Sequence, residues 1–504
     1  MSPVKSQEEM SSILKDHVAK TTFKPAAKLV ASQLNPHALN AKYAVRGRIP
    51  TKAEELRTKL ASESHSLPFN KIINANIGNP QQLDQKPITF YRQILSILQY
   101  PTILENPFID KIFPADIIER SKFLLKNIGS VGAYSHSQGI PYVRKSVAEF
   151  ITKRDGYKAD PNDVFLTTGA STAVSYLLGL LSLGPNTGFL IPIPQYPLYT
   201  ATLALNNSTA LPYYLQEEDD WSIDSTKLRQ IIIDSKAKGV EPRCLVVINP
   251  GNPTGAILKP EGIADLLGVA AEFGLVVIAD EVYQENIFKG EFVSVKKVLR
   301  QLQELDTTGL YKDVQLASLH STSKGVSGEC GQRGGYMELV GFDQSVRDQV
   351  IKIASISLCP VVTGQALVEL MINPPRPEEE SFTLYNEETS SIHNALEARA
   401  AKLYNTFNEM EGVTCQEPEG AMYCFPNLSL SKKVIAAAEK EGMEADEFYC
   451  NALLENTGIC AVPGSGFGQA EGTWHVRTTF LAPGTEWIDQ WKAFHAKFMD
   501  QYRD

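Results

Sequence analysis

The chain has 504 residues, 43% of them hydrophobic and 21% charged, so it can bury a full core and is neither disordered nor collagen-like. Its 48 Lys and Arg against 58 Asp and Glu give a net charge of -10, which argues against tight binding to nucleic acid or an anionic membrane. The seven cysteines are odd in number and form no C-x-x-C pair, which predicts reduced thiols in an intracellular compartment. The eight histidines show no ligand spacing, so we expect no metal site.

The first 70 residues are polar and interrupted by Pro25, Pro36 and Pro50, which predicts an N-terminal arm with short helices. The first 45 residues lack the apolar core of a secretory signal, which excludes such a signal. They also contain no Arg, which disfavours a mitochondrial presequence. The last residues match no retention or peroxisomal address. We therefore expect a cytoplasmic protein.

Between about residues 115 and 370, short apolar runs alternate with stretches of helical periodicity. The clearest unit has strands at 244–248 and 275–279, with a helix between them whose apolar residues recur at helical spacing. This pattern predicts an α/β fold in which helices cover a mostly parallel sheet. A proline-rich, acidic break at 373–380 then leads into a region with fewer continuous strands, expected to form a smaller α+β domain.

These shifts predict three parts of the chain. Residues 1–84 form the N-terminal arm and part of the small domain, residues 85–384 the large domain, and residues 385–504 the small C-terminal domain.

Four chemically distinctive segments follow predicted strands, where ligands bind in open α/β sheets. The first is Gly169-Ala170-Ser171, whose small residues at a strand-to-helix turn leave backbone N–H groups free for a phosphate. Alone it is a weak signal, and an ordinary helix start is the more frequent interpretation. The second is the loop NPGNPTG at 249–255, whose prolines and glycines fix a path that holds the Asn252 amide in place.

The third segment contains Asp280 and Tyr283, because a carboxylate at the end of a buried strand needs a cation or a proton donor. An N-cap role for Asp280 is the competing interpretation. The fourth is STSKG at 321–325, where Lys324 among small residues can act as an amine nucleophile. Its Ser-x-x-Lys spacing also matches penicillin-binding enzymes, but the chain lacks their Ser-Asp-Asn and Lys-Thr-Gly partners.

Together the segments supply a phosphate site, groups for a ring oxygen, a carboxylate for a ring nitrogen and an amine for an aldehyde, a combination that predicts pyridoxal 5'-phosphate as cofactor. The order of these motifs resembles the fold type I, class I and II aminotransferases. Longer stretches resemble their alanine aminotransferase branch: YAVRG (43–47), NIGNPQ (76–81), GAYSHSQG (132–139), IPIPQYPLY (191–199), ADEVYQENIF (279–288), SKGVSGECGQRGGY (323–336) and CPVVTGQ (359–365).

The resemblance implies cofactor roles. Lys324 bonds to the cofactor's aldehyde and moves the substrate's Cα proton, and Asp280 pairs with the ring nitrogen. Asn252 and Tyr283 hydrogen-bond to the ring oxygen, and Tyr196 stacks on the ring, unless it is simply a packed core tyrosine. The phosphate is assigned to a set of donors: Ser321, Ser323, Arg333 and the backbone of Ala170 and Ser171.

The resemblance also implies substrate and subunit contacts. Arg477 clamps the substrate α-carboxylate, Gly78 lets the backbone approach it, and Arg46 is a candidate for the distal carboxylate of glutamate. Tyr134 reaches the phosphate of the neighbouring subunit, which implies a homodimer with shared active sites. Tyr142 stands where glycine is expected, which leaves the loop path near the subunit boundary open.

The nine-residue step from Lys324 to Arg333 is what we expect of the alanine branch. The implied reaction is ping-pong transamination between L-alanine and 2-oxoglutarate, giving pyruvate and L-glutamate. Three alternatives remain open: glutamate:glyoxylate transamination, a β-lyase or cyclase reaction on the same cofactor, and a non-catalytic paralogue. Specificity depends on pocket volume, where one methylene contributes only ~1–3 kcal/mol.

Overall fold

The computed structural model describes residues 6–20, 22–24, 27–41, 47–62 and 66–504, and the chain divides into two units, Met1–Asn40 and Ala41–Asp504. The first unit contains α1 (Gln7–Lys20), a 3-10 turn at Ala31–Gln33 and α2 (Pro36–Asn40). Short helices therefore occur where the proline-interrupted pattern predicts them. Within the described ranges, no helix is both long and apolar enough to span a membrane.

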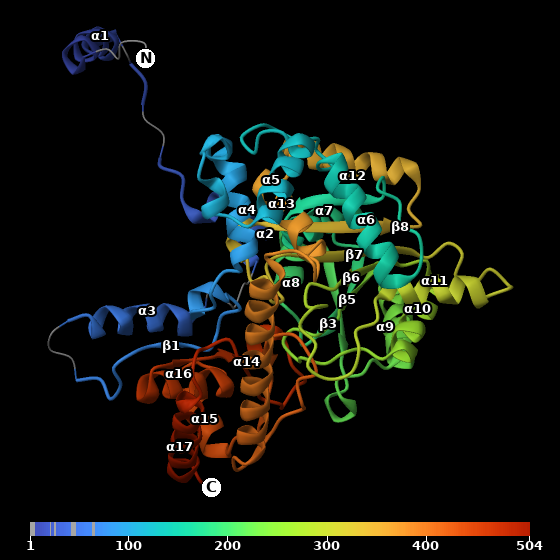
Figure 1. Ribbon diagram of the computed structural model, residues 1–504. Helices are drawn as coiled ribbons and strands as arrows, with labels where there is room; N and C mark the ends of the chain where they lie inside the picture. Colours follow the sequence, from blue (N-terminus) through green and yellow to red (C-terminus); the bar gives the residue numbers. More distant parts are fainter. Residues whose placement is uncertain (1–5, 21, 25–26, 42–46, 63–65) are drawn as a thin grey trace. The chain divides into compact units, whose positions relative to one another are not determined.

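The second unit is built on a seven-stranded sheet (Figure 1). In spatial order its strands are β2 (Val164–Thr168), β8 (Gly334–Val340), β7 (Gln315–Ser321), β6 (Val276–Asp280), β5 (Glu241–Ile248), β3 (Thr187–Ile193) and β4 (Thr209–Tyr214). Pairing is parallel from β7 through β4, and β8 runs antiparallel to both of its neighbours. The predicted α/β fold with a mostly parallel sheet is confirmed.

Helices cover both faces of this sheet. One face carries α9 (Ser225–Ala237), α10 (Pro260–Phe273) and α11 (Val295–Leu305), continued over β2 and β8 by α6 (Pro141–Asp155) and α13 (Val362–Ile372). The other face carries α7 (Ala170–Leu181), α8 (Leu198–Leu205) and α12 (Gln344–Ile356). Burial on both faces explains why the strands are near-continuous apolar runs in the sequence.

The predicted strand–helix–strand unit is formed by β5, α10 and β6. Pro260 stands at the first position of α10, where its missing N–H has no intrahelical partner to lose. Gly274 ends the helix with a φ of 67°, the left-handed conformation that favours glycine. These two residues determine where α10 begins and ends, and the chain then enters β6.

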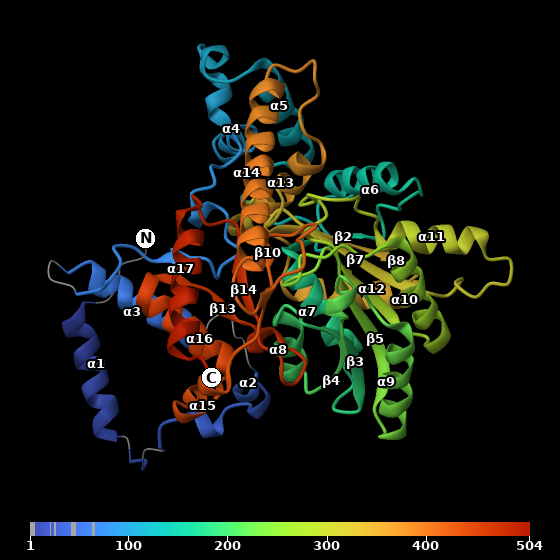
Figure 2. The ribbon, with the colours of Figure 1, turned by 90° about the horizontal axis from the view of Figure 1, so that it is seen from below.

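The remaining elements come from the beginning and the end of the second unit's sequence. Helices α4 (Thr89–Gln99) and α5 (Ala115–Ile128) pack together, and α14 (Phe382–Asn408) contacts α4 and α17 (Glu486–Gln501) (Figure 2). The other C-terminal elements are β9 (Val413–Thr414), β10 (Tyr423–Cys424), β11 (Asn427–Leu428), α15 (Lys432–Lys440), α16 (Ala445–Thr457), β12 (Ile459–Cys460), β13 (Val462–Pro463) and β14 (Val476–Thr479).

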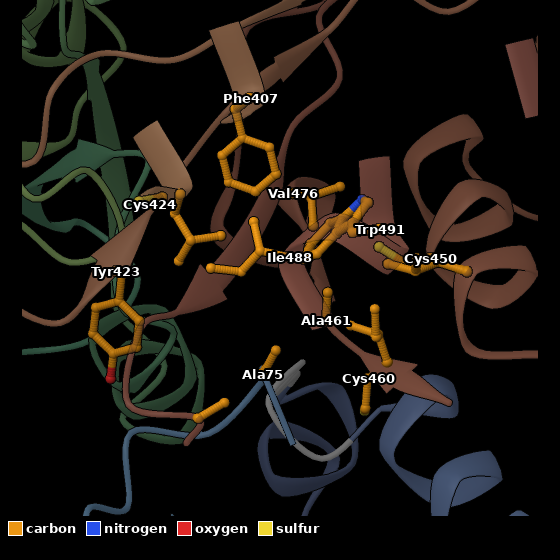
Figure 3. Close-up of a cluster of buried hydrophobic side chains, with 14 of the residues drawn as sticks. Ala75, Phe407, Tyr423, Cys424, Cys450, Cys460, Ala461, Val476, Ile488 and Trp491 are labelled. Carbon is orange, nitrogen blue, oxygen red and sulfur yellow. The ribbon is translucent and has the colours of Figure 1, made fainter. Parts of the chain in front are cut away.

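Two early elements, α3 (Arg48–Leu60) and β1 (Ile73–Asn74), belong to the same core as these C-terminal elements. Strand β1 pairs in parallel with β12, and the shared core contains side chains such as Phe407, Val476 and Trp491 (Figure 3). The domain limits at 84/85 and 384/385 remain predictions, and the second falls inside α14.

A buried network of charged residues lies on the α11 side of the sheet. Glu281 is fully buried and accepts hydrogen bonds from the Val295 amide at 2.8 Å and the Ser318 hydroxyl at 2.6 Å. Burial raises the pKa of Glu281 to about 7, although Arg154 and the two hydrogen bonds oppose this rise. In the folded protein this carboxyl therefore keeps its proton to a higher pH than in the unfolded chain.

Glu281→Gln tests this effect. Because the pKa of Glu281 is higher in the folded protein, its contribution to stability is full at low pH and falls as pH rises from 4.5 to about 7. The variant has no ionisable group at this position and does not lose this contribution. The unfolding free energy of the variant minus that of the parent should therefore increase by about 3 kcal/mol from about pH 5 to about pH 8. Urea unfolding of cofactor-saturated protein measures the difference. Glu397→Gln, on the exposed side of α14, is the control, and a pH-independent difference for Glu281→Gln would contradict the assignment.

Candidate active site

A cavity of about 630 Å³ opens at the carboxyl ends of the central parallel strands. It brings together the predicted site residues except Tyr134 and Arg46. Those residues are Gly78, Ala170, Ser171, Tyr196, Asn252, Asp280, Tyr283, Ser321, Ser323, Lys324, Arg333 and Arg477. Its size lies within the range of small-molecule sites, so a cofactor and a small substrate fit together.

Asp280 ends β6 and is 7% exposed. Its Oδ2 accepts a hydrogen bond from the Tyr199 hydroxyl at 2.8 Å, while Oδ1 has no partner among the described residues. Burial raises the pKa of Asp280, and Tyr199, the Val282 amide and Lys324 oppose this rise. One carboxylate oxygen is thus held by the protein and the other remains able to accept a proton donor.

Lys324 lies in the loop between β7 and β8. Its Nζ donates to the Gly78 carbonyl oxygen at 2.9 Å and lies 5.8 Å from the centre of the Tyr283 ring. Contacts to the 79–92 segment hold this loop, including a salt bridge between Arg92 and Glu329 at 2.8 Å. The amine is therefore fixed at the cavity wall.

Arg333 reaches the N-terminus of α7. Its guanidinium donates to the Thr168 carbonyl at 3.2 Å and the Ser171 hydroxyl at 3.3 Å. Gly169, with a φ of 75°, precedes the helix, and a Cβ there would lie 2.2 Å from the Arg333 guanidinium. Only glycine permits this approach, which gathers a cation and free helix N–H groups in one place. Ser321 and Ser323 line the same cavity.

Two tyrosine hydroxyls meet beside Asn252. The Asn252 side-chain amide donates to the Tyr283 hydroxyl at 3.4 Å, and Tyr283 donates to the Tyr423 hydroxyl at 3.3 Å. Burial raises the pKa of Tyr283 well above its usual value. Burial also acts to raise the pKa of Tyr423, but Lys324, Arg477 and Tyr283 outweigh it, so that the net pKa is lowered. Tyr423 is therefore the more acidic of the pair.

Arg477, in β14, is 2% exposed and lies between two aromatic rings. Its guanidinium carbon is 4.3 Å from the centre of the Tyr423 ring and 4.5 Å from that of Phe467. It donates to the Asn76 carbonyl at 2.6 Å and the Asn252 side chain at 3.3 Å, while Nε has no partner among the described residues. The rings fix the plane of the guanidinium and leave its edge for a carboxylate.

Three further sequence expectations concern residues that are not among those lining the cavity. Tyr134 is 79% exposed. Tyr142 lies in α6, where its hydroxyl donates to Glu369 at 3.2 Å and its ring packs edge-on against Phe123. The backbone at Tyr142 is thus helical rather than a loop. Arg46 lies outside the described residues.

The cavity fits pyridoxal phosphate. Asp280 Oδ1 and Arg477 Nε are buried polar atoms without partners in the described structure, and such atoms are costly unless a ligand satisfies them. The helix N-terminus with Arg333 suits a phosphate, and Lys324 suits an aldehyde. No cluster of His, Cys, Asp or Glu suited to a metal ion occurs within the described ranges.

Sequence reasoning missed several residues of this site. Tyr199 lies in the first turn of α8, three residues after Tyr196, within the same aromatic and proline-rich stretch at 191–199. Tyr423 and Phe467 gave no local signal, because their roles depend on chain segments brought together by folding. Tyr423 belongs to the apolar core that contains Phe407 and Trp491 (Figure 3), and it also lines the cavity.

Comparisons with known proteins agree with this geometry. The sequence model of the family described as aminotransferase class I and II matches residues 105–487. The chain is 60% identical to the mitochondrial alanine aminotransferase of Saccharomyces cerevisiae, over 97% of this chain and 84% of the relative. It is 56% identical to an inactive alanine aminotransferase of the same organism, over 96% of each.

The expected cytoplasmic location is contradicted by these comparisons. The yeast relative at 60% identity is named mitochondrial, as are relatives from Dictyostelium discoideum and Arabidopsis thaliana at 48% and 46% identity, which points to mitochondria. The expectation rested on the composition of the first 45 residues alone, which contain no Arg and carry acidic residues such as Glu8 and Glu9.

Among solved structures, the alanine aminotransferase of Pyrococcus furiosus superimposes with a TM-score of 0.72 at 26% identity, covering 93% of this chain and all of that one. Aspartate aminotransferase from Thermotoga maritima gives a TM-score of 0.66 at 19% identity and supports the fold alone. With the family match, the close relatives and the cavity at the sheet edge, the chain belongs to the aminotransferase class I and II family, whose cofactor is pyridoxal phosphate.

Proposed function

We propose that the protein is an alanine aminotransferase, which exchanges the amino group between L-alanine and 2-oxoglutarate and gives pyruvate and L-glutamate by a ping-pong cycle. The observation that carries the proposal is the convergence of Lys324, Asp280 and Arg477 on one cavity. Relatives named alanine aminotransferase at up to 60% identity support the choice of substrate.

The bound cofactor supplies an aldehyde that accepts the amino group and a ring that accepts electrons. Lys324 then holds and moves the proton at the substrate Cα, from a position where Gly78 orients its amine. Asp280 offers Oδ1 to the ring nitrogen, and Asn252 and Tyr283 offer hydrogen bonds to the ring oxygen. Each group occupies a fixed position before the substrate arrives, which lowers the cost of orientation.

Arg477 binds the α-carboxylate through its guanidinium edge, and Gly78 keeps the backbone close to it. The phosphate is held by the N-terminus of α7 at Ala170 and Ser171, by Arg333, and by Ser321 and Ser323. Tyr196 covers one face of the ring. These roles agree with the donor chemistry of each residue and with its place on the cavity wall.

We also propose a homodimer with shared active sites. Tyr134 is a large aromatic residue that is 79% exposed, and other large apolar side chains are exposed in nearby chain segments, among them Phe123 and Leu358. Exposed apolar groups of this size suit an interface with a second copy. Sedimentation equilibrium checks the assembly, and a monomer at all concentrations would contradict it.

Two alternatives have specific support. A glutamate–glyoxylate aminotransferase of Arabidopsis thaliana is 45% identical, and a yeast relative at 56% identity is named inactive. The intact set of cavity residues favours an active enzyme over a non-catalytic paralogue. Comparison of kcat/KM for alanine with 2-oxoglutarate and for glutamate with glyoxylate separates the two transaminations. Pyruvate release without an acceptor would instead indicate a lyase.

The first experiment is an absorbance spectrum of the cofactor-saturated protein, followed by L-alanine alone and then 2-oxoglutarate. We expect the visible band to convert to a near-ultraviolet band with alanine and to return with the keto acid. A band that does not change with alanine but responds to another amino acid would overturn the proposed substrate. Absence of cofactor binding would overturn the proposal that the protein is an active enzyme.

Lys324→Ala should abolish the covalent link to the cofactor and lower kcat by about 100- to 10,000-fold, because Lys324 is the one lysine among the described residues that line the cavity. Borohydride reduction followed by peptide mass spectrometry locates the link in the parent protein. Lys289→Ala, at an exposed lysine on the surface, is the control. Labelling of any other lysine in the parent would contradict the role of Lys324.

Gly78→Ala should lower kcat/KM for alanine by about 10- to 100-fold, because the new Cβ would lie 2.0 Å from the Tyr423 hydroxyl and 3.1 Å from Lys324 Nζ. Steady-state kinetics measure the change. Tyr423→Phe in the same chain removes the hydroxyl and should restore part of the loss.

Gly262→Ala is the control for this pair, because a Cβ there meets nothing within 4 Å. If Gly78→Ala matched this control, the close contact between Gly78 and Tyr423 would have no role in the reaction.

A further inference from the structure

Tyr199 is a buried tyrosine directly behind the cofactor cavity. It lies in the first turn of α8, three residues after Tyr196, and none of its side chain is exposed. Its hydroxyl donates to Asp280 Oδ2 at 2.8 Å, the one hydrogen bond from a side chain to this carboxylate in the described structure. The short segment from Tyr196 to the first turn of α8 therefore supplies both a tyrosine on the cavity wall and a tyrosine behind it.

This hydrogen bond determines which oxygen of Asp280 is available. With Oδ2 held by Tyr199, rotation of the carboxylate would break a buried, charge-assisted hydrogen bond. Oδ1 is left without a partner among the described residues and is free to accept a donor from a ligand. The orientation of Asp280 thus depends on a residue that lies outside the cavity lining.

The same contact affects the charge of Asp280. Burial favours the protonated carboxyl and raises the pKa of Asp280, and the Tyr199 hydroxyl is the largest opposing influence, ahead of the Val282 amide, Lys324 and His320. Tyr283 is a further titratable group that interacts with Asp280. Removal of the Tyr199 hydroxyl would therefore leave a carboxyl that is harder to ionise.

We propose that Tyr199 is a positioning residue for the reaction, which orients the Asp280 carboxylate so that Oδ1 meets the ring nitrogen of pyridoxal phosphate. The proposal rests on the assignment of Asp280 to that nitrogen under the proposed function. It adds a residue that acts on the cofactor only through Asp280.

Tyr199→Phe is the direct test, and Tyr213 offers a matched control. Tyr213 is also a buried tyrosine of the large sheet region, 3% exposed, and its hydroxyl donates to the Val246 carbonyl at 2.7 Å. It packs on the opposite face of the sheet, in the core with α9 and α10. Tyr213→Phe therefore removes a buried hydroxyl of equal chemistry without altering Asp280.

Two readouts separate positioning from a structural role. In the cofactor-saturated enzyme, Tyr199→Phe should release pyridoxal phosphate at least about tenfold faster on dilution, as followed by absorbance. It should lower kcat by at least about tenfold and leave KM for alanine within about twofold, because Arg477 is untouched. Tyr213→Phe should change each quantity by less than about twofold.

A double-mutant cycle with Asp280→Asn completes the test. If Tyr199 acts through Asp280, Tyr199→Phe should have no further effect on cofactor release in the Asp280→Asn background. Additive effects, equal behaviour of Tyr199→Phe and Tyr213→Phe, or an unfolded Tyr199→Phe protein would each overturn the proposal. If the wild-type protein did not respond to alanine, the proposed alanine aminotransferase function would be wrong. The rates of cofactor release would still test whether Tyr199 orients Asp280.

Discussion

Parallel pairing of β5, β6 and β7 fixes Ile248, Asp280 and Leu319 in register, and the whole candidate site depends on this alignment. The Asn252 loop, the Asp280 carboxylate and the Lys324 loop all lie at the same end of the sheet because the carboxyl ends of three parallel strands point the same way. Parallel strands require crossover helices, and these helices bury both faces and leave only the strand ends accessible. A site at this edge follows from the topology before any side chain is considered.

The site also concentrates charges where water is scarce. Arg477 is nearly fully buried, and its charge is balanced by backbone and amide oxygens and by two aromatic faces rather than by a carboxylate partner. An Arg–carboxylate salt bridge there would satisfy the guanidinium and compete with a substrate. Asp280 similarly has a neutral phenol as its side-chain partner. Neutral partners keep both charges available for a ligand, at the expense of the desolvation that burial imposes.

Much of this could be predicted from sequence because the information is local. Asp280 ends a strand, and Asn252 and Lys324 each follow a strand within a few residues, so the strand pattern and the turn chemistry suffice to bring them together. The contacts of Tyr199 and Tyr423 could not be predicted, since they join segments that are distant along the chain. Subcellular location was predicted wrongly because the prediction rested only on the composition of the first 45 residues, which the mitochondrial relatives contradict.

Strand β1 pairs with β12, so one of the first elements of the second unit finds its partner only after most of the chain. Helix α3 has Ile49, Ala53 and Leu56 buried in the same late-completed core. During synthesis this apolar surface leaves the ribosome long before the residues that cover it exist. The nascent chain must therefore carry an exposed hydrophobic segment through most of translation, which makes early binding by a chaperone advantageous and truncated chains prone to aggregation.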